Sequence, residues 1–281
     1  MSTQTPAPVT LAVANQKGGV AKTTSVASIG AALAELGHRV LLVDLDPQAC
    51  LTFSLGIDPE DLDISVHHVL TKGVDPAEVI IETEDGVDLM PATIELARAE
   101  ADLLTRTGRE HVIKGALEQL AEDLEDSEEG AYDWVLLDCP PSLGVLTVAA
   151  LTAADGVLIP LQCETLSHRG VGQLLDTVHD VRRFTNRGLE VWGVLPTLYD
   201  GRTNHARTVL ETISETYDLE VVEPPIPKTI KFAEAPAAGR SIIATSRSSK
   251  GANAYREVAR NLVERASRPK KKVAKKPARA K

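Results

Sequence analysis

The 281-residue sequence contains few aromatic residues, since Phe, Trp and Tyr together make up 3% of it. Apolar residues still make up 43%, so we expect a core built from Ala, Val, Leu and Ile. Cys50, Cys139 and Cys163 are an odd number and form no C-x-x-C pair. This argues against a disulfide framework or a zinc site and for a reducing compartment. Residues 1–8 lack the basic segment and apolar run of a signal peptide, and no apolar run approaches the ~18 residues that cross a bilayer. We therefore expect a cytoplasmic protein.

Charge is distributed unevenly along the chain, whose formal net charge is −10. Residues 267–281, SRPKKKVAKKPARAK, contain eight Lys and Arg and no acid, which leaves 22 basic against 40 acidic residues elsewhere. An acidic body with a basic tail indicates a tethered cationic arm. Because this composition cannot build a core, we predict disorder in 1–8 and 267–281 and one folded domain over 9–266.

Short apolar runs alternate with helical patterns through most of the chain. The runs expected to be strands cover residues 9–15, 39–46, 87–92, 132–138, 155–161 and 189–197. The expected helices cover residues 21–37, 94–106, 109–124, 145–153, 167–184, 203–216, 228–237 and 250–266, and the acidic run 122–129 is expected to be a surface loop. This alternation predicts an α/β fold with a doubly wound, mostly parallel sheet and helices on both faces.

Residues 15–24, NQKGGVAKTT, resemble a phosphate-binding loop in which two glycines are absent. The usual loop, G-x-x-x-x-G-K-[ST], would place them at Gln16 and Ala21. Gly18 and Gly19 are present instead, and their backbone N–H groups can form an anion nest at a helix N-terminus. The loop can therefore still bind phosphate.

Lys22 and Thr23 complete this loop. We expect Lys22 to reach the β- and γ-phosphates of a nucleotide and the Thr23 hydroxyl to bind Mg²⁺. We also expect Ala21 to have a helical φ, where a Cβ costs nothing.

Acidic residues follow two of the expected strands. Asp44 and Asp46 lie two residues apart in VDLDPQ, so they point the same way, and beside a Mg·nucleotide one can hold the metal's waters while the other orients an attacking water. Asp138 ends the apolar run of VLLDCPPS, as the acid of a Walker B strand does. Cys139 has no His in its motif, so we interpret it as a small buried residue.

Together these motifs resemble those of the ParA/MinD family of deviant Walker P-loop ATPases, and within it the Soj-like partition proteins. The loop matches K-G-G-x-x-K-[ST], with Lys17 at the position of the family's signature lysine. Further matching segments are PLQCETLSHRGVGQLL (160–175), PTLYDGRTNHAR (196–207) and PPIPKTIKFAEAP (224–236). The resemblance covers residues 10–266, and Ala21 departs from it because most relatives have Gly there.

The resemblance implies a slow ATPase that forms a homodimer with ATP, in which Lys17 crosses to the phosphates of the partner subunit's nucleotide. It implies that Asp46 positions the attacking water, that Thr23 binds Mg²⁺ directly, and that Asp44 and Asp138 bind it through water. The expected phosphate-binding residues are Lys17, Gly18, Gly19, Val20, Ala21, Lys22, Thr23 and Thr24.

The resemblance also implies a partition function, in which the ATP-bound dimer binds DNA without sequence preference at the nucleoid and a ParB-like partner stimulates hydrolysis and release. Arg202 and Lys231 match the family's DNA-facing positions, and Arg207, Lys228 and Arg240 are expected beside them. The cationic tail suits phosphate contact rather than base reading.

Other functions of the same superfamily fit less well. A membrane switch needs bulky apolar residues in a C-terminal amphipathic helix, whereas residues 268–281 contain one valine and two prolines, so we expect no stable membrane association. An iron–sulfur carrier needs paired cysteines. The short N-terminus leaves no room for a helix-turn-helix, so we do not expect binding to a specific operator. An orphan ATPase of the ParA/MinD type that positions another cargo, either a protein cluster or a membrane-linked system, stays open, because the partner chooses the cargo.

Overall fold

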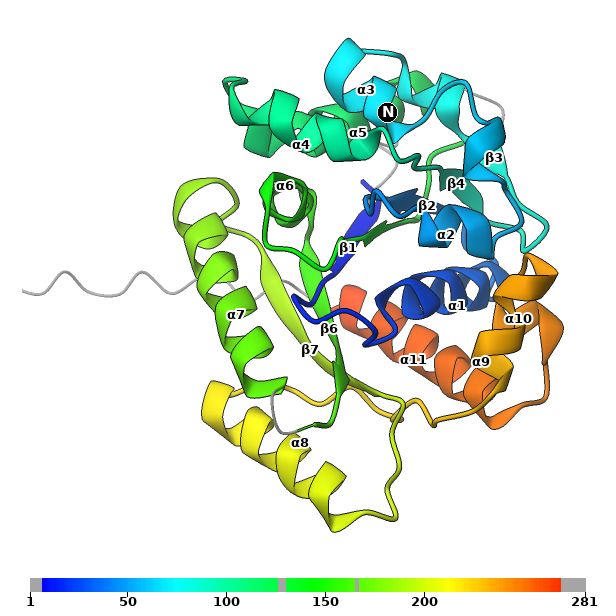
Figure 1. Cartoon of the computed structure of the whole chain (residues 1–281), viewed down its shortest axis with the longest axis vertical. Helices are drawn as coiled ribbons and strands as arrows, with labels where there is room; N and C mark the ends of the chain where they lie inside the picture. Colours follow the sequence, from blue (N-terminus) through cyan, green and yellow to red (C-terminus); the bar gives the residue numbers. More distant parts are fainter. Residues whose placement is uncertain (1–6, 126–129, 165–166, 269–281) are drawn as a thin grey trace, which may run out of the picture.

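Strands from most of the chain meet in one central sheet, shown in Figure 1. The computed structural model describes residues 7–125, 130–164 and 167–268. The predictions of disorder therefore fall mostly outside the described residues. Among these residues, seven strands pair in the order β3-β4-β2-β5-β1-β6-β7. They are β1 (Val9–Val13), β2 (Val40–Asp44), β3 (Ile81–Glu82), β4 (Asp88–Met90), β5 (Trp134–Asp138), β6 (Gly156–Gln162) and β7 (Glu190–Thr197).

The strand pairings are parallel except between β3 and β4. The helices that cover the sheet are α1 (Lys22–Glu35), α2 (Cys50–Ser54), α3 (Val66–Lys72), α4 (Leu96–Leu104), α5 (Val112–Leu124), α6 (Val145–Ala153), α7 (Ser167–Phe184), α8 (Asn204–Tyr217), α9 (Lys231–Glu234), α10 (Ile242–Thr245) and α11 (Lys250–Ala266). The predicted doubly wound, mostly parallel fold is confirmed.

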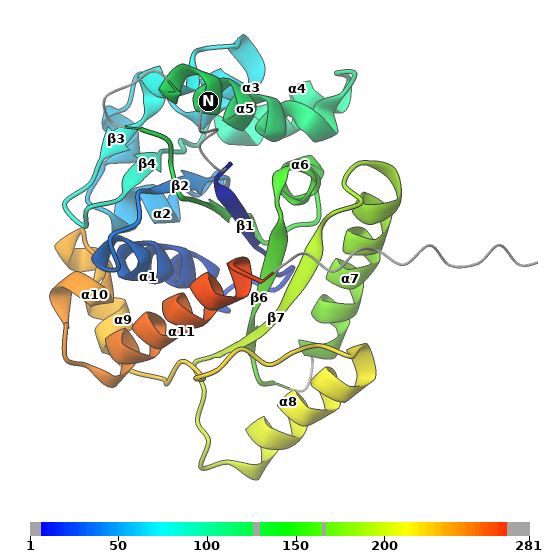
Figure 2. The ribbon, with the colours of Figure 1, turned by 180° about the vertical axis from the view of Figure 1, so that it is seen from behind.

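Each central strand contributes side chains to two separate cores, as the period of two in a strand requires. Leu42 of β2 and Leu136 of β5 belong to the core under α1 and α11. Leu41 and Leu137 belong to the core on the other face, which packs against α6 and α7. Figures 1 and 2 show these helix layers on the two sides of the sheet. Burial on both faces explains why the strands read as continuous apolar runs.

Both edges of the sheet are closed to further strands. At one edge β3 is only two residues long. At the other, the segment after α8 runs along β7, where Val194 N donates to Glu220 O and Val222 N donates to Val194 O, both at 2.8 Å. The same segment continues along the last part of β7, where Ile226 N donates to Pro196 O at 2.7 Å.

This pairing corrects one predicted element. The helix predicted over 228–237 begins too early and is not continuous, because the chain stays extended where Lys228 N donates to Tyr199 O at 3.4 Å. Only Lys231–Glu234 is α-helical, and a 3₁₀ turn follows at Pro236–Ala238.

The loop predicted over 122–129 is also wrong in its first part, because α5 continues to Leu124; residues 126–129 lie outside the described residues. The sequence patterns also missed α2, α3 and β3, which are short elements between β2 and β4.

Gly156 provides a test of this packing. A Cβ on Gly156 would overlap the indole ring of Trp192 on β7. We predict that Gly156→Ala lowers the free energy of unfolding by about 1–3 kcal/mol, measured by denaturant titration. The matched control is Gly115→Ala in α5, where a Cβ meets nothing within 4 Å, so it should raise stability by up to about 1 kcal/mol. Equal effects of the two changes would contradict this account.

Candidate functional site

The loop between β1 and α1 has the backbone of an anion-binding turn. Gly19 has φ 72°, and Ala21, which precedes the first residue of α1, has φ 63° and ψ 36°. The expectation that Ala21 has a helical φ is therefore wrong: the residue is left-handed, a conformation that favours glycine. The first turn of α1 leaves backbone N–H groups without intrahelical partners, so they can bind phosphate together with the nest.

Two side chains that the sequence patterns did not single out fix this loop to the sheet. Asn15 Nδ2 donates to Pro160 O of β6 at 2.7 Å, while Asn15 Oδ1 accepts from Lys17 N at 3.0 Å. At the other end of the loop, Thr197 Oγ1 at the end of β7 donates to Val20 O at 2.9 Å. The loop is thereby positioned by three strands rather than by its own sequence alone.

Asp44 and Asp138 lie side by side at the carboxyl ends of β2 and β5. They are register partners, and Asp138 is also the register partner of Val13 at the end of β1, where the loop begins. Because Leu42 and Leu136 point toward α1, strand alternation directs both carboxylates to the same face. Asp44 is 0% and Asp138 1% exposed, so the structure places two buried acids next to the loop.

The environments of these two acids differ. Asp44 Oδ2 accepts from Thr52 N at 2.9 Å and from Thr52 Oγ1 at 2.8 Å. Within the described ranges, neither carboxylate oxygen of Asp138 has a hydrogen-bond partner. Burial raises the pKa of Asp44 to about 6, against the Thr52 hydrogen bonds. Burial and the charge of Asp44 raise the pKa of Asp138 well above its usual value, while nearby Thr23 and Lys22 oppose the rise.

Asp46 lies in the turn after β2 and is partly exposed. Its backbone N donates to Asp44 Oδ1 at 3.1 Å, and its Oδ1 accepts from Gln48 N at 3.0 Å. The carboxylate therefore sits at the mouth of the site, beside the buried pair. Thr52, which positions Asp44, was missed because it lies eight residues away in a helix with no signal of its own.

The two lysines of the loop differ in burial. Lys22 is 7% exposed, and its Nζ lies 3.5 Å from Lys17 O. The side chain of Lys17 is 32% exposed and forms an ion pair with Glu164 in the segment after β6. The structure thus brings Lys17, Lys22, Thr23, Asp44, Asp46 and Asp138 to one end of the sheet.

Four of the five residues expected at a DNA surface lie close to one another along the chain or in space. Arg202 is in the turn before α8, with a side chain that is 90% exposed. Arg207 on α8 donates to Gly201 O in the same turn, at 2.9 Å from Nη2. The turn runs beside the segment that carries Lys228. Hydrogen bonds from Arg202, with a smaller contribution from the charge of Lys228, lower the pKa of Asp200 to about 2. Lys231 follows three residues later and is exposed.

Arg240 does not join this group. Its Nε donates to Asp85 Oδ1 at 2.9 Å, and the Asp85 side chain is only 1% exposed. Arg240 Nη2 also donates to Glu84 O at 2.7 Å. These contacts tie the segment before α10 to the turn between β3 and β4, which is a structural role.

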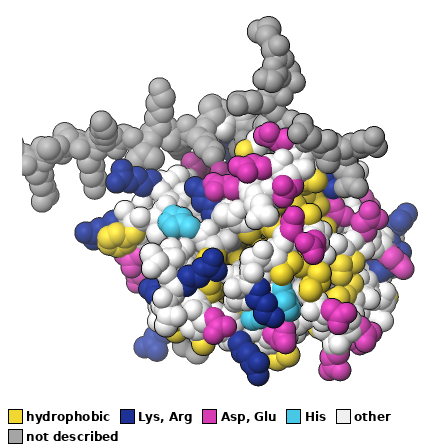
Figure 3. Space-filling model, turned by 90° about the horizontal axis from the view of Figure 1, so that it is seen from above, with side chains coloured by type: hydrophobic (Ala, Val, Ile, Leu, Met, Phe, Trp, Pro, Cys, Tyr) yellow, Lys and Arg dark blue, Asp and Glu magenta, His cyan; other side chains and the backbone are white. Residues whose placement is uncertain are grey.

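Neighbouring acidic residues offset the positive charges of Arg202 and Lys231. Arg202 pairs with Asp200 at 2.8 Å, and Lys231 pairs with Glu234 at 2.8 Å. Acidic side chains also gather on part of the face shown in Figure 3, which agrees with the net negative charge of the body. Among the described residues, Arg202 and Lys231 therefore contribute less net positive charge to this surface than two free cations would.

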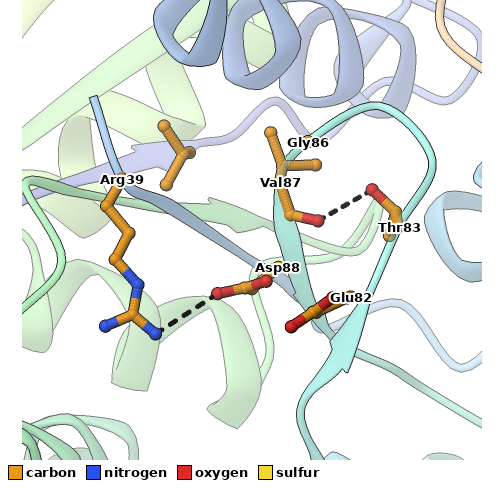
Figure 4. Close-up of a pocket in the computed structure, with 7 residues that line it drawn as sticks. Arg39, Glu82, Thr83, Gly86, Val87 and Asp88 are labelled. Atoms are coloured by element: carbon orange, nitrogen blue, oxygen red, sulfur yellow. Dashed lines mark hydrogen bonds and ion pairs between the residues drawn. The ribbon is translucent and has the colours of Figure 1, made fainter. Parts of the chain in front are cut away.

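An open hollow of about 450 Å³ lies at the opposite end of the strands, where β2 and β4 begin. Figure 4 shows the residues that line it. Arg39 lies 3.7 Å from Asp88 and stacks over the Tyr132 ring at 4.3 Å. Tyr132 donates its hydroxyl to Asp88 Oδ2 at 2.7 Å. Ligands of parallel α/β sheets bind at the carboxyl ends of the strands, so this hollow is not the nucleotide site.

Comparison with known proteins agrees with the geometry. A family model described as an AAA domain matches residues 9–191. The sporulation initiation inhibitor protein Soj of Bacillus subtilis is 42% identical over 253 residues, which are 90% of this chain and 97% of that protein. The chain belongs to the AAA-domain family and is a ParA/Soj-like ATPase.

Two further similarities bear on this ParA/Soj-like ATPase. The chromosome partitioning protein ParA of Caulobacter vibrioides is 38% identical over 256 residues, 91% of this chain and 94% of that protein. A crystal structure described as cobyrinic acid a,c-diamide synthase from Mycobacterium smegmatis with bound ADP and magnesium is 54% identical in sequence to this chain. The two structures superpose with a TM-score of 0.81, and the alignment covers 94% of this chain and 97% of the M. smegmatis chain. The predicted family is confirmed.

The left-handed backbone of Ala21 yields a prediction. Glycine at this position removes the Cβ strain but gains freedom in the unfolded chain, so Ala21→Gly should raise the free energy of unfolding by a net ~0.5–1 kcal/mol. The control is Ala101→Gly on the exposed face of α4, which should lower it by about 1 kcal/mol. Denaturant titration measures both; destabilisation by Ala21→Gly would contradict the assigned conformation.

The unpartnered carboxylate of Asp138 yields a second prediction. In nucleotide-free, metal-free buffer at pH 8, Asp138→Asn should raise the free energy of unfolding by about 2 kcal/mol, because folding no longer buries a carboxyl group that is ionised in the unfolded chain. The gain should shrink as the pH falls toward 4. The folded protein then keeps the Asp138 proton because its pKa is raised, while the unfolded chain binds one only near pH 4. Asp123→Asn on the exposed surface of α5 is the control and should change nothing; a gain independent of pH would contradict the argument.

Proposed function

We propose that this partition-type ATPase binds DNA without sequence preference as an ATP-bound homodimer, at the nucleoid, and releases it after hydrolysis stimulated by a ParB-like partner. The observation that carries the nucleotide part is the pair Asp44 and Asp138, two buried acids in register beside Lys22 and Thr23 of the loop. ATP and Mg²⁺ are its cofactors, as the ADP and magnesium of the M. smegmatis structure support.

The residues present fit a metal-bound nucleotide. The Asp138 oxygens are buried without a hydrogen-bond partner among the described residues, so they can accept hydrogen bonds from metal-bound waters. Thr23 would be the direct ligand, and Asp44 and Asp138 would hold waters around the ion. Mg²⁺ supplies charge neutralisation of the phosphates when bound.

The loop and the acids divide the remaining tasks. The nest formed by Gly18 to Ala21 and the start of α1 cradle the phosphates, with Lys22 supplying charge. Asp46, at the mouth of the site, orients the attacking water and accepts its hydrogen bond. Lys17 lies outside this cradle, which supports a role at the phosphates of a partner subunit.

The DNA part is supported by the surface that joins Arg202, Arg207, Lys228 and Lys231. Asp200 and Glu234 offset its charge, so a single copy offers only weak attraction to phosphate. A dimer presents the surface twice, and two linked contacts bind far more tightly than one. This is why we expect DNA binding to require ATP and to fall steeply with salt.

The similarity to a diamide synthase favours a second candidate, an ATP-dependent amide-forming enzyme. If such an enzyme took its nitrogen from glutamine, it would need an activated thiolate. Burial raises the pKa of all three thiols here, that of Cys163 to about 11 and those of Cys50 and Cys139 in the same direction. The environment of the thiols therefore favours the partition function.

A DNA-retention titration tests the proposal at two salt concentrations, with ATP, ADP or no nucleotide. The wild type should retain DNA of any sequence with ATP only. The double variant Arg202→Ala/Lys231→Ala should lose affinity by about tenfold or more, because phosphate contacts dominate such binding. Arg187→Ala/Lys114→Ala, which removes the same charge elsewhere, should bind as the wild type does.

Two further proteins in the same titration separate the parts of the proposal. Asp46→Ala should keep DNA bound with ATP over time, because the water loses its orienting group while nucleotide binding is retained. Removal of residues 269–281 should weaken binding without removing its dependence on ATP. The proposal would be overturned if the wild type bound DNA equally well with ATP and with ADP and if this binding disappeared when the tail was removed. That result would favour an orphan ATPase that positions another cargo.

A further inference from the structure

Lys17 is engaged within its own subunit in this structure. Its Nζ lies 2.5 Å from Glu164 Oε2, and the two side chains are 32% and 53% exposed. The residues are 147 positions apart in the sequence. They meet because β1 and β6 are adjacent parallel strands, so the segments that follow the two strands begin side by side at the carboxyl ends of the strands.

The backbone holds both partners in place for this contact. Lys17 N donates to Asn15 Oδ1 at 3.0 Å, and Asn15 Nδ2 donates to Pro160 O of β6 at 2.7 Å. Glu164 N donates to Gln162 O, the last residue of β6, at 2.8 Å. Asn15 therefore connects the base of Lys17 to the same strand that carries Glu164.

We propose that Glu164 is a positioning residue that holds Lys17 in its own subunit and thereby opposes ATP-dependent dimerisation. The proposal rests on the proposed function, in which the Lys17 ammonium crosses to the partner subunit's nucleotide. That ammonium cannot pair fully with Glu164 and with a partner's phosphates at the same time. Each subunit must therefore release one ion pair when the dimer forms.

The solvent exposure of Lys17 and Glu164 limits how strongly their ion pair can oppose dimerisation. An ion pair in which both side chains are this exposed shifts an equilibrium by at most about fivefold. The dimer releases two such pairs, so neutralising Glu164 should tighten dimerisation by roughly two- to twentyfold. Salt screens the pair, so added salt should reduce this difference between variant and wild type.

The first measurement is the dimer dissociation constant in saturating ATP, by sedimentation, with Asp46→Ala in every protein to limit hydrolysis. We expect Glu164→Gln to lower the constant by roughly two- to twentyfold at low salt, and Glu164→Asp, which keeps the charge, to lie nearer the parent. Glu122→Gln on the exposed surface of α5 is the control for loss of one negative charge and should match the parent. An unchanged or weaker dimer in Glu164→Gln would overturn the proposal.

The second measurement tests the ion pair without any dimer. In nucleotide-free protein, acylation of Lys17 by an amine-reactive reagent is followed by mass spectrometry, with Lys114 as internal reference. Glu164→Gln should raise the labelling rate of Lys17 severalfold, because the carboxylate no longer holds the ammonium. Unchanged labelling would overturn the proposal at its first step.

The two measurements keep this proposal and the proposed function apart. If the parent does not dimerise with ATP, the proposed function fails, and so does the role of Glu164 in dimerisation, whatever the labelling shows. If the parent dimerises but Glu164→Gln changes only the labelling, the function stands and the proposal is wrong.

Discussion

The burial of two carboxylates in adjacent positions of a parallel ladder is the constraint on which this structure depends. Asp44 and Asp138 are register partners at the ends of β2 and β5, and both are almost fully buried. Burial raises the pKa of both acids, and the charge of Asp44 raises that of Asp138 further. Two adjacent buried acids lower the stability of a fold, so their presence indicates a functional site rather than a structural role.

The surroundings limit this cost without removing it. Thr52 satisfies one oxygen of Asp44 with two hydrogen bonds, and Lys22 brings a positive charge near Asp138. The site is held firmly because its elements belong to the centre of the fold: β1 pairs with β5 and β6, and α1 packs against α11. Rigid strands and a fixed loop thus position groups that would otherwise move apart.

Much of this arrangement could be predicted from the sequence, because its signals are local. Continuous apolar runs identified the strands, and Asp44, Asp46 and Asp138 stand directly at or after the ends of two of them. What could not be predicted depends on contacts between distant segments. Asn15 and Glu164 depend on β6, and Thr197 reaches the loop from β7.

Two wrong predictions have the same cause. Ala21 is left-handed although an alanine by itself does not favour that conformation, so local preference did not predict its φ. The segment near Lys228 was predicted to be helical, but backbone pairing with Tyr199 keeps it extended. In both cases tertiary contacts outweigh local preference.

The closed edges of the sheet have a consequence for assembly. A two-residue β3 offers little template to an incoming strand, and the segment around Glu220 to Ile226 already occupies the outer side of β7. Neither edge therefore invites the strand-to-strand stacking that leads to fibres. Copies of this chain at high local concentration therefore find little exposed strand edge from which an irreversible sheet could grow.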